Sequence, residues 1–202
     1  MMNKGLLFVV SAPAGCGKDT ILEQVLAQTE NVGYSVSATT RAPRPGEVDG
    51  THYFFLTREK FEQMIEEGAV LEYTEYCGNY YGTPKKGVED MLAQGKDVIL
   101  KIEVEGAMNI KKLFPDCCLV FILPPSMQEL ERRLRKRGTE DEPTILRRTA
   151  QAREEIDTAV NYDYFVVNDA LEDAVQDLMA VIRAEKCRKG RCLDLLRQIK
   201  GE

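Results

Sequence analysis

The stretch Leu6 to Thr20 reads Leu-Leu-Phe-Val-Val-Ser-Ala-Pro-Ala-Gly-Cys-Gly-Lys-Asp-Thr, and it carries more structural information than any other part of the chain. Its first five residues are apolar, two of them β-branched, and they predict a short buried strand. A turn rich in Gly and Pro follows, after which Ile21 to Leu26 takes up helical spacing. A strand that runs through a glycine turn into a helix forms a cradle of backbone N–H groups at the positive end of the helix dipole. Lys18 adds a full positive charge, so the stretch predicts a phosphate-binding loop.

The turn resembles a Walker A loop, whose consensus is Gly-x-x-x-x-Gly-Lys-Ser/Thr. Ala12 replaces the first Gly of that consensus, and Asp19 takes the place of the hydroxyl residue, while Thr20 comes one position later. A strand-to-helix turn that merely needs small residues is the alternative interpretation. The position after a predicted strand and before a predicted helix favours a nucleotide site.

Length and charge limit the other classes of function. At 202 residues the chain is long enough for one domain with a substantial core, and 44% hydrophobic and 30% charged residues are ordinary for a globular protein. The 27 Lys and Arg residues against 33 Asp and Glu give a net charge of −6, which argues against polymeric nucleic acid as a partner. No apolar run approaches the ~20 residues that span a bilayer, so we expect no membrane association.

Cysteine spacing indicates a reducing compartment, and we expect a cytoplasmic protein. The six cysteines form no C-x-x-C pair and the chain has a single histidine, His52, so neither a zinc site nor a disulfide framework is expected. Cys16 lies inside the loop, where it is either an oxidation-sensitive thiol or a small residue at a variable position, and we favour the second interpretation. The cysteines are Cys16, Cys77, Cys117, Cys118, Cys187 and Cys192.

Short apolar strands alternate with helical patterns along much of the chain. Further strands are predicted over residues 98–103, 118–123 and 164–167, and helices over residues 18–28, 84–94, 126–137, 143–159 and 170–188. This alternation predicts an α/β fold of three layers, α/β/α, with a parallel central sheet. Ligands of such sheets bind at the carboxyl ends of the strands, where the phosphate-binding loop lies.

Two segments break the alternation. Residues 33–83, rich in Thr, Arg, Pro, Gly and Tyr, predict an inserted β-rich lobe, and residues 126–158 are densely charged and helical. Within the first segment, Arg41 and Arg44 lie three residues apart among hydroxyl side chains and prolines. Two guanidinium forks suit a second phosphate, because each fork binds two oxygens at once. A solvated basic loop is the alternative that these residues leave open.

The chain closely resembles guanylate kinases, the P-loop nucleoside monophosphate kinases that phosphorylate GMP with ATP, over about residues 4–186. The resemblance rests on the phosphate loop and on six motifs: Ser-Val-Ser-x-Thr-Thr-Arg-x-Pro-Arg-x-Gly-Glu, Gly-Asn-Tyr-Tyr-Gly-Thr, Ile-Glu-Val-x-Gly-Ala, Leu-Pro-Pro-Ser, Arg-Gly-Thr-Glu and Val-Asn-Asp. It implies one guanylate-kinase-like domain. The implied parts are a core of residues 1–33, 84–125 and 159–202, a GMP-binding lobe of about 34–83 and a helical lid of about 126–158.

The resemblance implies a GMP site in the inserted lobe. Guanidinium groups and phenolic hydroxyls suit the phosphate dianion, and a carboxylate accepts from both N1–H and N2–H of guanine. Adenine offers no such pair, so AMP would leave the carboxylate unpaired. The implied residues are Arg41, Arg44, Tyr53 and Tyr81 for the phosphate, and Ser37, Glu72 and Thr83 for the base.

The resemblance implies that ATP lies on the phosphate loop and that lid arginines close over the transferring phosphoryl group. The implied catalytic residues are Lys18, Arg133, Arg137 and Arg148. The neighbouring Arg132, Arg135 and Arg147 are expected to face solvent. The implied ATP-binding residues are Ala12, Pro13, Ala14, Gly15, Cys16, Gly17, Lys18, Asp19, Thr20 and, near the adenine, Asn168.

Mg²⁺ that accompanies ATP is the expected cofactor, with Asp19 and, through water, Glu103 as candidate ligands. A carboxylate at Asp19 either helps to hold the metal or repels the nucleotide, and Lys101 stands where the family usually has an acid. No general base is required, because the GMP phosphate, with a second pKa near ~6, is already nucleophilic at neutral pH. Catalysis is then positioning and neutralisation of charge on the γ-phosphoryl group.

Three functions are compatible with these observations. We expect an ATP:GMP phosphotransferase that also accepts dGMP and serves purine nucleotide metabolism and GMP recycling, as a monomer or small homo-oligomer. A P-loop kinase of another small nucleotide and a non-catalytic binding module are the alternatives. Such modules typically lose phosphate-loop or GMP residues, so the presence of Lys18, Arg41, Arg44 and Glu72 favours catalysis. Residues 190–202 have no assigned role.

Overall fold

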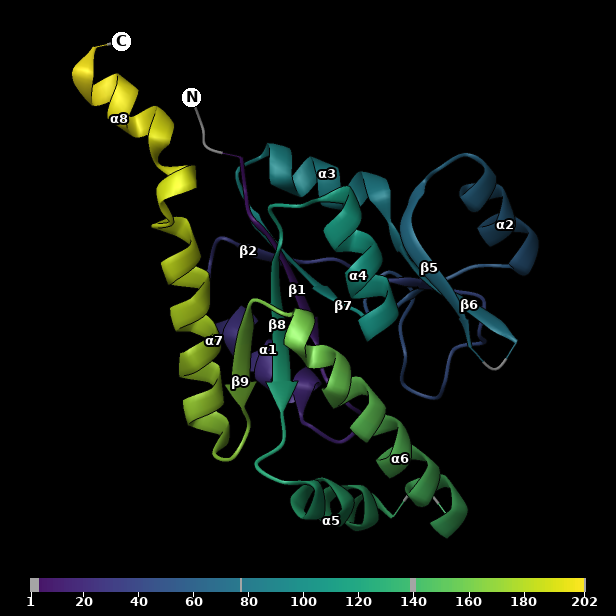
Figure 1. Ribbon diagram of the computed structural model, residues 1–202. Helices are drawn as coiled ribbons and strands as arrows, with labels where there is room; N and C mark the ends of the chain where they lie inside the picture. Colours follow the sequence, from purple (N-terminus) through teal and green to yellow (C-terminus); the bar gives the residue numbers. More distant parts are fainter. Residues whose placement is uncertain (1–3, 77, 139–140, 202) are drawn as a thin grey trace. The chain divides into compact units, whose positions relative to one another are not determined.

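A computed structural model describes residues 4–76, 78–138 and 141–201 of the chain (Figure 1). The described residues divide into two compact units. The first unit holds the residues up to Ser11 together with Thr29–Leu119, and the second holds Ala12–Gln28 together with the residues from Val120 onward.

The central sheet has five strands in the order β2-β7-β1-β8-β9. In the first unit both β1 and β2 pair with β7 in parallel, and in the second β8 pairs with β9 in parallel. β1 and most of β7 and β8 are buried, which explains why these strands are nearly continuous apolar runs. The predicted parallel α/β sheet is therefore confirmed. The strands are β1 (Leu7–Ser11), β2 (Val32–Tyr34), β7 (Asp97–Lys101), β8 (Cys118–Leu123) and β9 (Tyr164–Val167).

The inserted lobe, within the first unit, contains a second sheet of four strands in the order β4-β3-β6-β5. β6 pairs antiparallel with both β3 and β5, whereas β3 and β4 run parallel. The β-rich lobe predicted from the sequence is thus present. Its strands are β3 (Ala38–Thr39), β4 (Phe54–Phe55), β5 (Val70–Tyr76) and β6 (Asn79–Pro84).

The lobe also contains a helix that was not predicted from the sequence, α2 (Arg58–Glu66), which packs against β6. Thr57 caps it by accepting a hydrogen bond from the Lys60 backbone N–H. Phe61 is fully buried and stacks on the Tyr80 ring at a centroid distance of 5.2 Å. Phe61, Met64 and Ile65 follow the i, i+3, i+4 spacing of a helix, but residues 33–83 were interpreted as a β-rich lobe, so this signal was overlooked.

Two further helices of the first unit lie against the sheets. α3 (Lys85–Ala93) packs on β7, close to the predicted range of 84–94, and α4 (Val104–Leu113) packs on β1 and β5. No helix was predicted between the strands expected at 98–103 and 118–123, because Gly106 lies within this segment and glycine is a poor helix former. Helix α4 passes through Gly106, with Ala107 and Ile110 fully buried.

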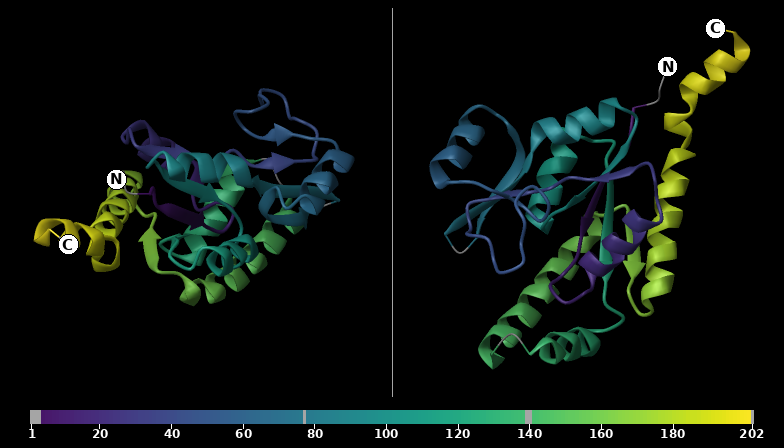
Figure 2. Two further views of the ribbon diagram at one scale, coloured as in Figure 1. Left: turned by 90° about the horizontal axis from the view of Figure 1, so that it is seen from above. Right: turned by 180° about the vertical axis from the view of Figure 1, so that it is seen from behind.

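In the second unit, α1 lies beside α7, as the right-hand view of Figure 2 shows, and α7 also packs on β9. α5 packs against α6. These four helices agree with the predicted ranges to within two residues at each end. A short terminal helix, α8, follows α7. The elements are α1 (Lys18–Ala27), α5 (Met127–Arg137), α6 (Glu142–Thr158), α7 (Leu171–Lys186), α8 (Leu193–Lys200) and the 3₁₀ turns Ala159–Asn161 and Lys189–Arg191.

Among the helices that the structure describes, none combines the length and the apolar character needed to cross a membrane.

Candidate functional site

The phosphate-binding loop runs from Ala12 to Gly17 and leads directly into α1 at Lys18. Gly15 and Gly17 have φ angles of +94° and +81°, a left-handed conformation that disfavours other residue types. Gly17 is the N-cap of α1 and no side chain caps the helix there. An anion bound at this point would lie beside the first N–H groups of α1, at the positive end of the helix dipole.

Helix α5 supports this loop from its apolar side. A Cβ atom on Gly15 would lie 3.0 Å from a methyl group of Leu134 and 3.1 Å from one of Leu130. Both leucines are almost fully buried. Gly15 is thus required by its φ angle and by the close packing of α5 on the loop, two constraints that a random glycine turn would not meet.

Asn168 holds the loop from another direction. Its side-chain Nδ2 donates to the backbone oxygen of Cys16 at 2.7 Å, and its own backbone oxygen accepts from Arg133 Nη1 at 3.0 Å. Asn168 was expected near the adenine and Arg133 over the transferring phosphoryl group. Both reach the loop region, where Asn168 bonds to the backbone of Cys16 and Arg133 to the backbone of Asn168.

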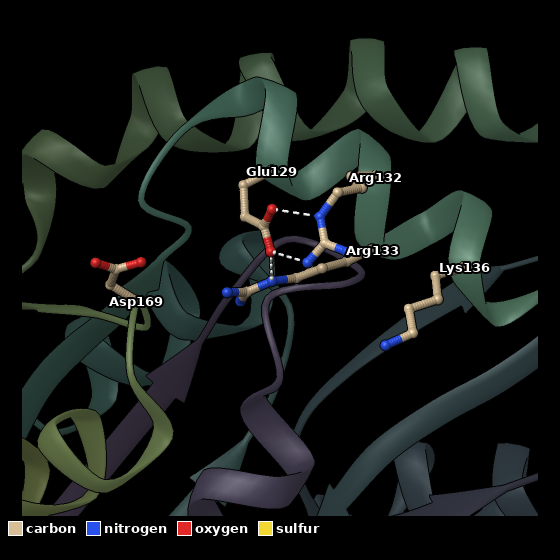
Figure 3. A pocket seen from close by; sticks show the side chains of 5 residues that line it. All are labelled: Glu129, Arg132, Arg133, Lys136 and Asp169. Atoms are coloured by element: carbon tan, nitrogen blue, oxygen red, sulfur yellow. Dashed lines mark hydrogen bonds and ion pairs between the residues drawn. The ribbon is translucent and has the colours of Figure 1, made fainter.

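The charged face of α5 forms an open pocket of about 570 Å³, shown in Figure 3. The carboxylate of Glu129 binds Arg132 at 2.7 Å and Arg133 at 2.8 Å, and these two guanidinium groups lower the pKa of Glu129 to about 2. Lys136 and Asp169 complete the lining of the pocket; in Figure 3 the dashed lines join only Glu129 to the two arginines. Three cationic groups against two carboxylates make this a suitable wall for an anionic ligand.

The remaining lid arginines differ in exposure. Arg132 and Arg135 are 62% and 43% exposed, and Arg135 pairs with Glu131 and Glu142, while Arg147 is also exposed. The prediction that these three face solvent is confirmed. Arg148 lies half-buried on α6. The side chain of Arg137, together with Thr139 and Glu140 of the predicted lid motif, lies outside the described residues.

Cys16, a residue of the loop, is fully buried, and burial raises the pKa of its thiol to about 12. A protonated, inaccessible thiol is a poor nucleophile, since the thiolate is the reactive form. These properties favour the interpretation of Cys16 as a packing residue over that of an oxidation-sensitive thiol.

We expect iodoacetamide at pH 7.5 to leave Cys16 of the folded protein unmodified while it alkylates the exposed Cys187. Peptide mass spectrometry after a timed quench measures both sites in one sample, with urea-unfolded protein as the control in which both react. Alkylation of Cys16 at a rate similar to that of Cys187 would contradict the buried assignment.

The first unit brings together the residues of the predicted GMP phosphate site. Arg41 binds Glu47 through two nitrogen–oxygen contacts of 2.8 and 2.9 Å, and its guanidinium carbon lies 5.5 Å from the ring centre of Tyr53. The Tyr53 and Tyr81 rings meet edge to face at 6.2 Å. The bond from Arg41, assisted by the Arg44 backbone N–H, lowers the pKa of Glu47 to about 2. Glu47 therefore stays charged at neutral pH and orients Arg41.

The predicted guanine-reading residues Glu72 and Thr83 are in direct contact. Thr83 Oγ1 donates to Glu72 Oε1 at 2.6 Å, and both residues are more than 90% buried. A Cβ atom on Gly106 would lie only 2.7 Å from Glu72 Oε2, so glycine at this position of α4 leaves room for the carboxylate where it lies. Burial, opposed by the Thr83 bond and reinforced by the charge of Glu103, raises the pKa of Glu72. The site thus holds a desolvated carboxylate in a fixed position.

The remaining predicted site residues of the first unit are Ser37, Arg44 and Glu103, and Lys101 lies close to Glu103 in the sequence. Ser37 is half-buried and its backbone oxygen accepts from the Phe54 N–H, while Arg44 is exposed. Glu103 is the exposed N-cap of α4. The Lys101 ammonium lies 5.7 Å from the centre of the Tyr34 ring at the end of β7. Glu47 and Gly106 were quoted in motifs but given no role.

The metal candidates are single carboxylates. Asp19 is exposed in the first turn of α1, followed by the exposed Thr20, and both belong to the second unit. Within the described ranges, no group of three or more His, Cys, Asp or Glu side chains could hold a metal ion. This sparse donor set fits Mg²⁺, which keeps several waters and binds proteins through one or two carboxylates together with substrate phosphates.

Comparisons with known proteins place these sites in a family context. The family model described as "Guanylate kinase" matches residues 4–185. A guanylate kinase of Desulfitobacterium hafniense is 51% identical over 189 residues, which cover 94% of each chain. A guanylate kinase of Carboxydothermus hydrogenoformans is 52% identical over 190 residues, covering 94% of this chain and 93% of that one. The crystal structure of guanylate kinase from Anaplasma phagocytophilum superposes with a TM-score of 0.79 at 33% identity, covering 97% and 95% of the two chains.

Proposed function

Because the chain belongs to the guanylate kinase family and is a nucleoside monophosphate kinase that transfers a phosphoryl group from ATP to GMP, we propose which of its residues bind each nucleotide. The buried Glu72 carries the assignment of the acceptor. Its carboxylate accepts from N1–H and N2–H of guanine, and Thr83 and Ser37 complete the contacts with the base. An unpaired buried charge is costly, so a desolvated carboxylate fits a ligand that donates two hydrogen bonds to it, as guanine does.

The GMP phosphate binds to Arg41, Arg44, Tyr53 and Tyr81. Arg41 is already oriented by Glu47 and by the Tyr53 ring, so little side-chain freedom is lost when the phosphate arrives. None of the proposed contacts addresses the ribose 2′-hydroxyl. We therefore extend the acceptor specificity to dGMP.

ATP binds to the loop from Ala12 to Gly17 and to the first turn of α1. Lys18 neutralises charge on the transferring phosphoryl group, as do the lid residues Arg133, Arg137 and Arg148 once they turn toward the nucleotide. Mg²⁺ bound with ATP would be held by the phosphates and, through water, by Asp19 or Glu103, where it supplies further neutralisation of phosphate charge. The proposed organisation keeps residues 34–83 as the GMP lobe and 126–158 as the lid, both closing to exclude water.

The cellular setting follows from the reaction. Conversion of GMP to GDP recycles guanine nucleotides in purine metabolism, and we place the enzyme in the cytoplasm, where ATP is abundant. Its proposed partners are ATP and GMP, without polymeric nucleic acid or a membrane, and it acts as a monomer or small homo-oligomer.

We expect purified protein with Mg²⁺ and ATP to phosphorylate GMP and dGMP, and to act on AMP and UMP at least 10²-fold less efficiently. An assay that couples ADP formation to NADH oxidation, run over the four acceptors, measures kcat/KM for each. Equal efficiency with AMP or UMP would favour a P-loop kinase of broader specificity. Absence of turnover with all four would favour a non-catalytic binding module.

A further inference from the structure

Asn168 lies at the carboxyl end of β9, where the chain turns toward α7. Its backbone N–H donates to the Leu123 oxygen at 2.8 Å, which joins the ends of β9 and β8. The residue is 6% exposed, so its side-chain amide is removed from solvent and must be paired within the protein. These constraints fix the backbone from which the amide projects.

The buried amide pairs with the phosphate-binding loop. Asn168 Nδ2 donates to the Cys16 oxygen at 2.7 Å across 152 residues of sequence. The peptide between Cys16 and Gly17 is trans, so its C=O and N–H point in opposite directions. A bond that pulls the Cys16 oxygen toward Asn168 therefore turns the Gly17 N–H the other way, away from Asn168.

Gly17 is shaped to allow this contact. A Cβ atom at Gly17 would lie 2.5 Å from Asn168 Nδ2, closer than real Cβ atoms approach a neighbour. The φ angle of +81° independently favours glycine. The last glycine of the loop is thus needed for its own conformation and for the approach of Asn168.

Asn168 is in turn connected to the lid. Arg133 Nη1 donates to the Asn168 backbone oxygen at 3.0 Å, and Arg133 Nε binds Glu129 at 2.8 Å. Figure 3 shows Arg133 reaching from α5 past Glu129. One chain of contacts therefore runs from α5 through Asn168 to the Cys16–Gly17 peptide.

We propose that Asn168 is a positioning residue for the donor phosphates, acting through the Cys16–Gly17 peptide, rather than a residue that reads adenine. By holding the Cys16 oxygen, Asn168 keeps the Gly17 N–H directed toward the position that the phosphates of ATP will occupy, even before ATP binds. A carbonyl released from this bond would let the peptide rotate and present an oxygen to the phosphates. The inference rests on the proposed ATP site and specifies how that site is kept in its binding conformation.

The test compares ATP with inorganic tripolyphosphate, which has no base. We expect N168A to raise the KM for ATP and the Kd for tripolyphosphate, each measured with Mg²⁺, by the same factor of about 10. Calorimetry gives the tripolyphosphate Kd without turnover, so it remains readable even if wild-type protein failed to phosphorylate GMP. A weaker affinity for ATP alone would show that Asn168 contacts the base, and unchanged values for both ligands would also overturn the proposal.

A second variant keeps the size of the side chain. N168D places an acceptor against the Cys16 oxygen, and only its protonated form can donate. We expect kcat/KM for ATP relative to wild type to rise as the pH is lowered from 8 to 5.5, since burial raises the pKa of such a carboxyl group. A flat ratio of N168D to wild type across this range would contradict a donor role, whatever the stability of N168A.

Asn161 provides a matched control on the same unit. It is exposed, and its Nδ2 donates to the Thr158 oxygen at 3.0 Å, away from the loop. N161A removes the same kind of bond, an amide to a backbone oxygen, and is expected to leave both affinities within twofold of wild type.

Discussion

Replacing Lys18 with Ala is expected to lower kcat for GMP phosphorylation by about 10³-fold or more. Phosphoryl transfer depends on positioning and on neutralising the transferring group, and single cationic groups at such sites contribute about 10³–10⁵ in kcat. Lys18 is the first residue of α1 and follows directly on the glycine loop, so its ammonium is proposed to reach the ATP phosphates. Stopped assays with long incubation and radiolabelled ATP measure rates this low.

The loss in K18A should not come from unfolding. A positive charge at a helix N-terminus opposes the helix dipole, so its removal is expected to leave the free energy of unfolding unchanged or slightly higher. Thermal denaturation of K18A and wild type checks this point. K112A supplies the matched control, because Lys112 is an exposed lysine near the end of α4 that bonds only with Asn109 among the described side-chain contacts. If K18A retained most of its activity, the proposed role of Lys18 would have to be abandoned.

The phosphate loop could be predicted because its signals are local. The strand, the glycine turn and the helix follow one another within Leu6–Leu26, and the structure reproduces β1 and α1 to within one or two residues of the expected bounds. The bounds of β8 and β9 were likewise predicted correctly, since each is a short apolar run that ends at Pro or Asn, although only Val166 of β9 is buried. α4 was missed because Gly106 is a poor helix former by propensity, whereas here the missing side chain leaves room for the nearby Glu72 carboxylate.

Contacts between distant parts of the sequence could not be predicted in the same way. Arg41 and Arg44 were predicted to bind a phosphate as a pair, which stays a prediction, yet Glu47 was not identified as the partner that orients Arg41, although it lies only six residues away. The short spacing of Glu47 from the two arginines in the sequence was a signal that could have predicted this ion pair. Asn168 was placed near the adenine by resemblance. Its bond to the Cys16 oxygen depends on how β9 and the loop meet in space, which no local pattern specifies.

Replacing Glu72 with Gln is expected to lower the preference for GMP over AMP by about 10²-fold or more. Each charged hydrogen bond to guanine contributes about 1.5–3 kcal/mol, and a Gln amide presents one N–H donor where guanine also presents a donor. The N–H of the same amide can instead donate to N1 of adenine, which is an acceptor, so activity with AMP should rise while activity with GMP falls. The ratio of kcat/KM for GMP to that for AMP measures both changes.

E75Q is the matched control for this variant. Glu75 lies on the same strand, β5, but is 47% exposed and pairs with Arg58, so its replacement removes an equal charge without touching the proposed base site. We expect its GMP to AMP ratio to match that of wild type. A ratio in E72Q as high as that in E75Q would remove Glu72 from the specificity site.

Stability should change in the opposite direction to specificity in E72Q. Burial raises the pKa of Glu72 above its usual value of 4.5, which means that the folded protein disfavours the charged form when no nucleotide is bound. Wild-type stability from this group is therefore fully present below pH 4.5 and is lost as the pH rises through the raised pKa. Urea unfolding without ligand should thus find E72Q at least as stable as wild type at pH 7.5, with the difference shrinking as the pH falls. A variant that was less stable at pH 7.5 would mean that the carboxylate supports the fold rather than the binding of guanine.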